Sequence, residues 1–180
     1  HKAATIDEAE KIINLARKNH CTIESRLASD TVEADRFWRI RRDTLPALKA
    51  KGKDHLEADV VVPRYELPFL VHAIKEIEKA HNVKIATFGH AGDGNLHVTI
   101  QYRKRSFTET EDAYNVLEEV YKKTLDMSGK LTGEHGVGIT VKNYMTLQMT
   151  HQELELMKRI KYAFDPKGLL NPKKIFPENT

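Results

Sequence analysis

Two histidines and a glutamate are the side chains of this sequence whose types and spacing could do chemistry. His90 and His97 flank the turn "AGDG" within "FGHAGDGNLHVTI", and Glu134 stands in "GEHGVG", immediately before His135. Two imidazoles and one carboxylate that leave coordination positions open are the ligands expected of a catalytic divalent metal such as Zn²⁺, and they also suit Mn²⁺ or Fe²⁺. Whether they form such a site depends on the elements that position them.

Alternating strand and helix patterns surround these residues and predict an α+β fold. Strands are expected over 56–63, 84–90, 95–103 and 130–132. Helices are expected between them over 65–80 and 108–127. The order strand, helix, strand, strand, helix, strand is the split βαβ pattern of a ferredoxin-like antiparallel sheet.

Additional helices are expected at both ends of the chain. Apolar residues recur at helical spacing over 5–18, and Asp30 with Glu33 could begin a second helix that runs toward Pro46. Near the C-terminus, a Thr150–Glu153 capping box predicts the start of another helix.

The expected strand order decides which strand ends meet. We expect the spatial order four, one, three, two, with strands one and three parallel and the other neighbours antiparallel. His90 then ends strand two, His97 begins strand three and Glu134 follows strand four, so all three lie at one edge of the sheet. The start of strand one shares that edge. Arg41 could approach it through the loop at 50–55 and hold a carboxylate by a bidentate pair.

From the residues alone, simpler explanations stay open. His90 could be a turn residue, His97 a half-buried strand residue, and Glu134 with His135 a cap for the following segment. The glycines fit hairpin geometry without any ligand, and Arg41 could be a solvated helix residue. Two other classes of protein also stay open: a free-standing metal-dependent hydrolase that uses the same His, His and Glu set, and a non-catalytic ferredoxin-like binding module.

Composition narrows the classes further. A chain of 180 residues, 40% of them apolar, can bury the core of one domain, and its apolar runs are too short and interrupted for a membrane span. The net charge of +3 is small and dispersed, which argues against a nucleic-acid partner. The single cysteine, Cys21, cannot form an internal disulfide. This favours a reducing compartment, and we expect a cytoplasmic location.

Three ordered motifs, "FGHAGDGNLHVTI", "GKLTGEHGVG" and "AFDPKGLLNPKKIFP", resemble the C-terminal domain of FAD-linked oxidases. This is the glycolate oxidase and D-lactate dehydrogenase group of the vanillyl-alcohol-oxidase flavoprotein superfamily. "FWRIRRDTLPAL" and "DVVVPRYELP" extend the resemblance, so residues 1–180 are expected to be one substrate or cap domain.

The resemblance implies a cap with a ferredoxin-like core that covers a flavin. The FAD is expected to be held by a separate N-terminal FAD-binding domain of the same parent protein, absent from this chain. A small D-2-hydroxy acid of the lactate or glycolate type would be oxidised to the 2-oxo acid. No pyrophosphate-binding segment of the family is recognised here, so we expect the fragment alone to be inactive.

Motif by motif, the resemblance also implies roles for individual residues. His90, His97 and Glu134 would bind the divalent metal, Zn, Mn or Fe. His135 would be the catalytic base beside the flavin, and Arg41 would bind the substrate carboxylate. An electron-acceptor subunit is a further expected partner, through which the protein could lie at the periphery of a membrane.

The sequence departs from some relatives at two positions. Those that act on longer hydroxy acids resemble this chain but carry a lysine where it has Glu57 and an asparagine where it has Thr99. These differences argue against a dicarboxylic substrate and favour a small monocarboxylate.

Overall fold

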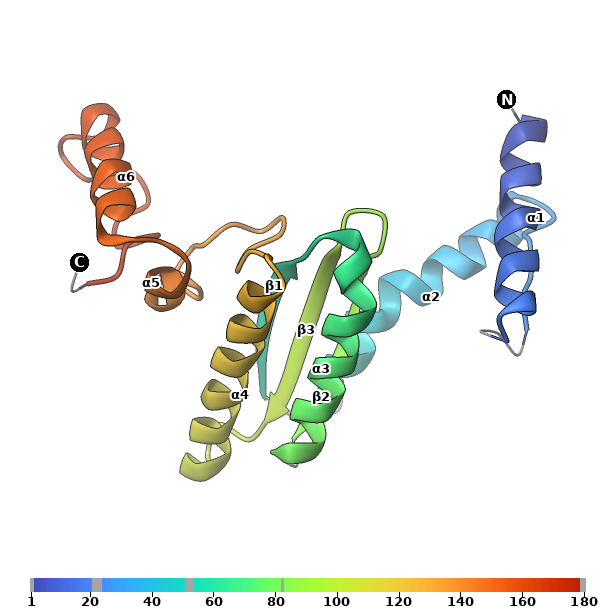
Figure 1. Ribbon diagram of the computed structural model, residues 1–180, viewed down its shortest axis with the longest axis horizontal. Coiled ribbons are helices and arrows are strands. Elements are labelled where there is room, and N and C mark those ends of the chain that lie inside the picture. The colour runs from blue at the N-terminus through green and yellow to red at the C-terminus, as the bar shows by residue number, and fades with distance from the viewer. Residues whose placement is uncertain (1, 21–23, 51–53, 82, 179–180) are drawn as a thin grey trace. The chain divides into compact units, whose positions relative to one another are not determined.

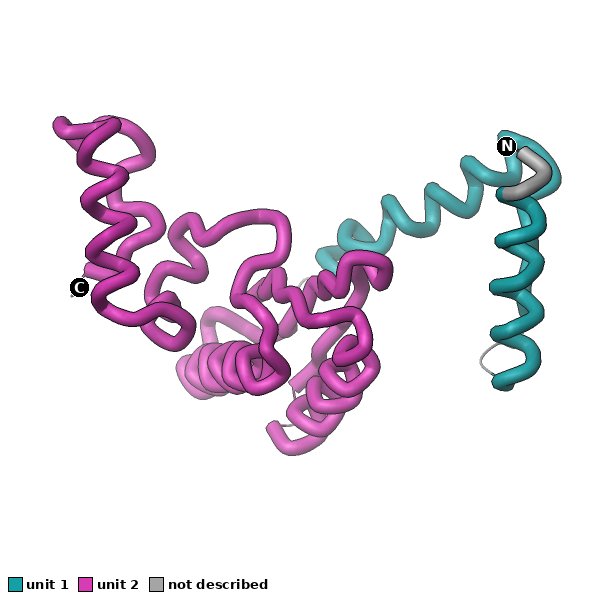
Figure 2. Tube along the Cα trace, turned by 45° about the horizontal axis from the view of Figure 1, so that its top comes forward, with its two compact units in different colours: residues 1–51 teal, residues 52–180 magenta. Residues whose placement is uncertain are grey.

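The computed structural model describes residues 2–20, 24–50, 54–81 and 83–178. The chain divides into two compact units, residues 1–51 and residues 52–180, which are coloured separately in Figure 2. Cys21 lies outside the described residues. None of the helices within these described ranges is both long and apolar enough to cross a lipid bilayer.

The first unit contains two helices, α1 (Lys2–Lys18) and α2 (Thr31–Lys49). Both were expected, although α1 begins earlier than residue 5. Asp30 caps α2 by accepting a hydrogen bond from the Glu33 amide at 2.8 Å. The helix continues through Pro46, and none of its residues is buried within the unit as the structure describes it.

The second unit is built on a three-stranded sheet (Figure 1). Its elements, in chain order, are β1 (Asp54–Val61), a 3₁₀ turn (Arg64–Glu66), α3 (Leu67–Ala80), β2 (Lys84–His90), β3 (Asn95–Tyr102) and α4 (Phe107–Asp126). The strand order is β1-β3-β2. The expected fourth strand is reduced to two isolated bridges beside β1, Val61 with Lys130 and Asp59 with Thr132. The ferredoxin-like α+β pattern is thus confirmed, with a rudimentary fourth strand.

The expected parallel pairing of strands one and three is wrong. β3 is antiparallel to both of its neighbours. The crossover through α3 makes β1 and β2 run in the same direction, and the tight hairpin then returns β3 between them. Val61 therefore pairs with Asn95, so the end of β1 lies beside the histidine edge. Asp54, where β1 starts, pairs with Tyr102 at the opposite end, so the expectation that the start of strand one shares the histidine edge is wrong as well.

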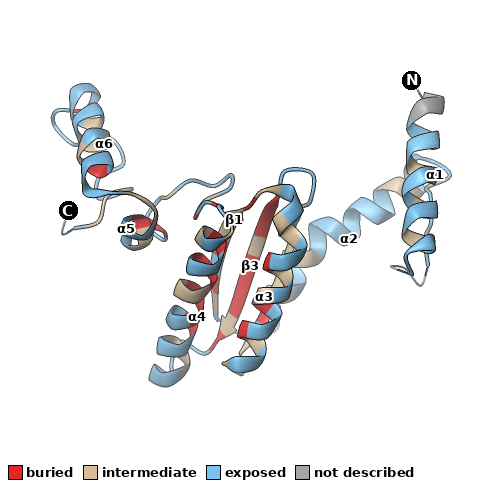
Figure 3. Cartoon of the chain, in the orientation of Figure 1, coloured by how far each residue is buried: buried red, intermediate tan, exposed pale blue. Residues whose placement is uncertain are grey.

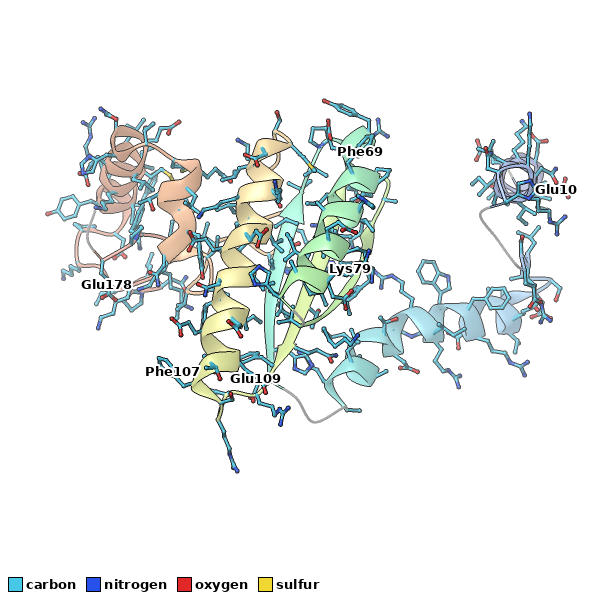
Figure 4. All side chains as sticks on the ribbon, turned by 60° about the horizontal axis from the view of Figure 1, so that its bottom comes forward. Glu10, Phe69, Lys79, Phe107, Glu109 and Glu178 are labelled. Atoms are coloured by element: carbon cyan, nitrogen blue, oxygen red, sulfur yellow. The ribbon has the colours of Figure 1, made fainter. Side chains whose placement is uncertain are left out.

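Helices α3 and α4 cover one face of the sheet (Figure 1). The buried positions gather on the strands and on the sides of these helices that face them (Figure 3). On β3 the side chains alternate, so that Leu96 and Val98 join this core while His97 lies on the opposite face. The outer sides of the helices are exposed, as the labelled Phe107 at the start of α4 shows (Figure 4).

The segment after the bridges contains two elements that the sequence pattern did not predict. These are a 3₁₀ turn (Lys142–Tyr144) and the four-residue helix α5 (Met145–Gln148). The expected helix α6 (His151–Phe164) follows, and its Thr150–Glu153 capping box is confirmed. Beyond α6, Asp165 accepts hydrogen bonds from the amides of Leu169 and Leu170, both at 2.9 Å, and fixes the tail.

Candidate metal and catalytic site

The β2–β3 hairpin sets the two histidines on one face of the sheet. His90 and Asn95 are direct cross-strand partners, and His97 lies two residues further along β3. The turn needs a glycine at its end, because Gly94 has a φ of 73° and a Cβ there would lie 2.0 Å from the Val62 carbonyl oxygen. The two imidazole rings meet edge to face, with their centroids 5.6 Å apart.

The third group arrives on the segment that bridges to β1. Lys130 and Val61 exchange backbone hydrogen bonds of 2.8 and 3.1 Å, and the Gly133 amide donates to the Asp59 carbonyl at 2.8 Å. A Cβ on Gly133 would lie 1.9 Å from Nδ2 of Asn95, so only glycine allows the segment to approach so closely. Glu134 follows directly and reaches the histidines.

One oxygen of Glu134 lies among the imidazole nitrogens. Its Oε1 is 3.6 Å from Nε2 of His90 and 3.3 Å from Nε2 of His97. These distances exceed the roughly 2.7–2.9 Å of a charge-assisted hydrogen bond. They match the spacing of two ligands on a tetrahedral ion, which is about 3.4 Å for ligand distances of about 2.1 Å. The donor atoms of all three residues lie within 4.8 Å of one another.

His135 completes the cluster on its open side. Its ring stacks on that of His97, with centroids 5.2 Å apart and planes 16° apart, and its Nε2 lies 3.4 Å from Oε1 of Glu134. The side chain of His135 is 65% exposed, whereas that of His97 is 16% exposed. The cluster is therefore anchored on the sheet and accessible from the His135 side.

Asp59 is a member of the cluster that the sequence analysis missed. Its carboxylate accepts hydrogen bonds from Nδ2 of Asn95 at 2.7 Å and from the amides of Glu134 and His135, both at 2.8 Å. Burial works to raise the pKa of Asp59, but these three donors outweigh it and hold the pKa below its usual range. The wrong strand direction had placed this residue away from the histidines; antiparallel pairing with β3 would have indicated it.

Arg41 lies on α2. It belongs to the first unit, whereas the histidines belong to the second. Its guanidinium lies 5.9 Å from the centre of the Trp38 ring on α2. Its neighbours Arg39 and Arg42 both pair with Asp35. The role predicted for Arg41 therefore stays a prediction.

The two positions at which the resemblance implied a difference from relatives that act on longer acids are paired in the sheet. Glu57 on β1 lies directly opposite Thr99 on β3, and the next pair on the same face is Asp59 with His97. Thr99 is buried and Glu57 is exposed. Glu57 and Thr99 therefore lie side by side, next to the cluster.

Comparison with known proteins assigns the chain to a family. Residues 1–175 match the family of FAD linked oxidases, C-terminal domain, and the chain belongs to this family. The predicted resemblance is thereby confirmed.

Individual relatives carry more specific names. The chain is 35% identical to the glycolate oxidase subunit GlcD of Bacillus subtilis, over 96% of this chain and 36% of that protein. It is also 35% identical to the mitochondrial D-lactate dehydrogenase [cytochrome] 1 of Saccharomyces cerevisiae, over 96% of this chain and 30% of that protein. The chain thus spans about a third of the length of these relatives.

A solved structure shares the fold. The 4-ethylphenol oxidase from Gulosibacter chungangensis, in its isoeugenol complex, matches 70% of this chain and 25% of its own chain with a TM-score of 0.50. The sequence identity is 20%, so this likeness concerns the fold alone. Membership of the FAD-linked oxidase family favours neither the hydrolase nor the non-catalytic module.

Proposed function

We propose that this chain is the substrate- and metal-binding part of an FAD-dependent enzyme that oxidises a small D-2-hydroxy acid, of the lactate or glycolate type, to the 2-oxo acid. The observation that carries the proposal is the position of Glu134 Oε1 beside the Nε2 atoms of His90 and His97, at the spacing of metal ligands. Family membership and the names of the relatives support the reaction class.

The donor set fits a divalent cation. His90, His97 and Glu134 offer two nitrogens and one oxygen, a combination suited to Zn²⁺ and compatible with Mn²⁺ or Fe²⁺. When bound, such a cation would lower the pKa of the substrate hydroxyl and orient the molecule through its hydroxyl and carboxylate oxygens. The exposed side of the cluster at His135 leaves room for a substrate to enter.

His135 is the proton acceptor in this proposal. Its Nε2 lies on the Glu134 side of the ring, where the hydroxyl of the substrate would be held, and histidine is the side chain that commonly serves as a proton acceptor in catalysis. Bound FAD would supply the redox chemistry as the acceptor of the Cα hydrogen and its electron pair, together a hydride. The proton goes to His135, and the hydroxyl carbon becomes the carbonyl of the 2-oxo acid.

In this proposal Arg41 binds the substrate carboxylate, and Glu57 with Thr99 select for the size of the substrate. The guanidinium of Arg41 is exposed on α2 and could hold the substrate carboxylate in a bidentate pair. Glu57 and Thr99 offer no cation for a second carboxylate, which favours a monocarboxylic acid.

An FAD-binding portion is the main partner that we propose. The chain spans about a third of the length of its relatives. Large apolar side chains are exposed within each unit, among them Trp38 and Ile40 in the first and Phe164 and Leu169 in the second. Such surfaces are suited to packing against further protein. An electron-acceptor subunit is a second proposed partner. Binding to that subunit could also hold the protein at the periphery of a membrane.

Stopped-flow flavin reduction tests the proposal on the protein assembled with its FAD-binding portion. D-lactate or glycolate should bleach the flavin absorbance, whereas L-lactate should not. The His135→Ala variant should reduce flavin about 10²–10⁴-fold more slowly. No reduction by any member of a panel of 2-hydroxy acids, or an unchanged rate in the variant, would contradict the proposed reaction or the proposed base.

A further inference from the structure

We propose that Asp59 is the positioning residue of this site: it fixes the backbone that carries Glu134 and His135 and selects the imidazole tautomers of His97 and His135. The inference rests on the proposed function in that it gives the cluster a metal-binding task. Asp59 pairs with His97 across β1 and β3, and its side chain is 11% exposed. It occupies the floor of the cluster, next to all of the groups that it would position.

The backbone part of the inference follows from three donors. Oδ2 of Asp59 accepts hydrogen bonds from two successive amides, those of Glu134 and His135, and its carbonyl accepts the preceding amide, that of Gly133. Three consecutive amides of a segment with only two bridges to the sheet therefore bind to one residue. Without these bonds, Glu134 and His135 would be held to β1 only through the residues before them.

The Asn95 amide holds the carboxylate in this orientation. Nδ2 of Asn95 donates to Oδ1 of Asp59 at 2.7 Å and to the Val60 carbonyl at 3.2 Å. Asn95 is itself 4% exposed, so its side chain is confined by packing. Oδ2 is left to face the Glu134–His135 backbone.

The imidazole part follows from which nitrogen faces which carboxylate. Nδ1 of His97 lies 3.4 Å from Oδ1 of Asp59, and Nδ1 of His135 lies 3.5 Å from Oδ2. A carboxylate beside Nδ1 favours the tautomer that carries its proton there, because the other tautomer would turn a lone pair toward negative charge. The Nε2 atoms of both rings face Oε1 of Glu134, at 3.3 and 3.4 Å, and this carboxylate by itself favours the opposite tautomer. The side chain of Asp59 is 11% exposed and that of Glu134 is 48% exposed, so solvent screens the charge of Glu134 more strongly and Asp59 decides the tautomer. Nε2 of His97 is thereby ready to bind a metal, and Nε2 of His135 to accept a proton.

The alternative is that Asp59 only fixes a turn, as Asp54 does at the other end of the same strand. Oδ2 of Asp54 accepts the Lys104 amide at 2.8 Å, far from the histidines in the register. Asp54→Asn is therefore the matched control for Asp59→Asn. Both substitutions weaken hydrogen bonds from backbone amides to a carboxylate. Only Asp59→Asn also removes a negative charge from beside the imidazoles of His97 and His135.

Two measurements on the purified chain test the inference. The first is ¹H–¹⁵N NMR of the imidazoles in the metal-free chain at about pH 8.5, two units above the ordinary histidine pKa. We expect His97 and His135 to carry the proton on Nδ1 in the unsubstituted chain and in Asp54→Asn, and to shift toward the Nε2 tautomer in Asp59→Asn. The second is competitive titration with Zn²⁺, in which Asp59→Asn should bind about 10–100-fold more weakly while Asp54→Asn should not change.

The outcomes separate this inference from the proposed function. Unchanged tautomers and unchanged Zn²⁺ affinity in Asp59→Asn would overturn the positioning role even if the chain binds the metal tightly. If the unsubstituted chain binds no metal, the proposed function fails, and the tautomer measurement still decides the role of Asp59. If Asp59→Asn does not fold, the spectrum of the unsubstituted chain decides: a dominant Nε2 tautomer in either ring would refute the inference.

Discussion

Replacing Gly133 with alanine should destabilise the second unit by disrupting the floor of the cluster. The added Cβ would lie 1.9 Å from Nδ2 of Asn95, so the buried amide must move. Its bonds to the Asp59 carboxylate and to the Val60 carbonyl would then be lost. A charge-assisted bond contributes about 1.5–3 kcal/mol and a neutral one about 1 kcal/mol, so unfolding should become easier by about 2–4 kcal/mol.

Thermal unfolding followed by circular dichroism measures this effect. For a chain of this size, about 2–4 °C is lost per kcal/mol, which predicts a midpoint lower by about 4–16 °C for Gly133→Ala. Gly92→Ala in the nearby turn is the matched control, because a Cβ on Gly92 meets nothing within 4 Å and its effect should stay within about 0.5 kcal/mol. Equal midpoints for the two variants would refute the close packing of Gly133 on Asn95.

Three further predictions concern other parts of the chain. Thr150→Ala should cost about 1 kcal/mol in denaturant unfolding by removing the N-cap of α6, whereas Thr150→Ser should cost little; equal losses would argue against the capping box. His135→Ala should leave Zn²⁺ affinity within a few-fold of the unsubstituted chain, because His135 is assigned to the proton and not to the metal; loss of binding would make it a ligand. The ammonium of Lys161 lowers the pKa of Asp165, burial raises it, and the amides of Leu170 and Leu169 lower it further. The net effect holds the pKa of this carboxyl below its usual range. The stabilisation of the tail by the Asp165 carboxylate is therefore complete above about pH 4, the pKa of an unfolded aspartate. It is lost as the pH falls through the lowered pKa that Asp165 has in the folded chain. An NMR titration of the Asp165 carboxyl with a midpoint at or above 3.9 would show that this sign is wrong.

Local patterns predicted most of the elements of the fold. The glycine-containing turn and the alternation on either side of it predicted β2 and β3 almost to the residue. The capping box predicted the start of α6, because both of its partners are close in sequence. The short helix α5 was missed, since four residues are too few to show a periodic pattern.

The direction of β1 relative to β3 could not be predicted from the local sequence pattern. His90, His97 and Glu134 were expected at one edge, and the structure brings them together. Asp59 was missed because the wrong end of β1 was placed at that edge. The hydrogen bonds of Asp59 to Glu134 and His135 span more than 70 residues of chain, and the bridges from β1 to Lys130 and Thr132 bring these residues together.

Calorimetric titration of Zn²⁺ and of Mn²⁺ into the chelator-treated chain measures whether His90, His97 and Glu134 form a metal site. We predict one ion per chain and a loss of affinity of at least about 100-fold in each of His90→Ala, His97→Ala and Glu134→Ala. His72→Ala, which removes an exposed histidine on α3, should bind as the unsubstituted chain does. Binding of neither ion, or affinity that survives all three substitutions, would contradict the assignment of this cluster as a metal site.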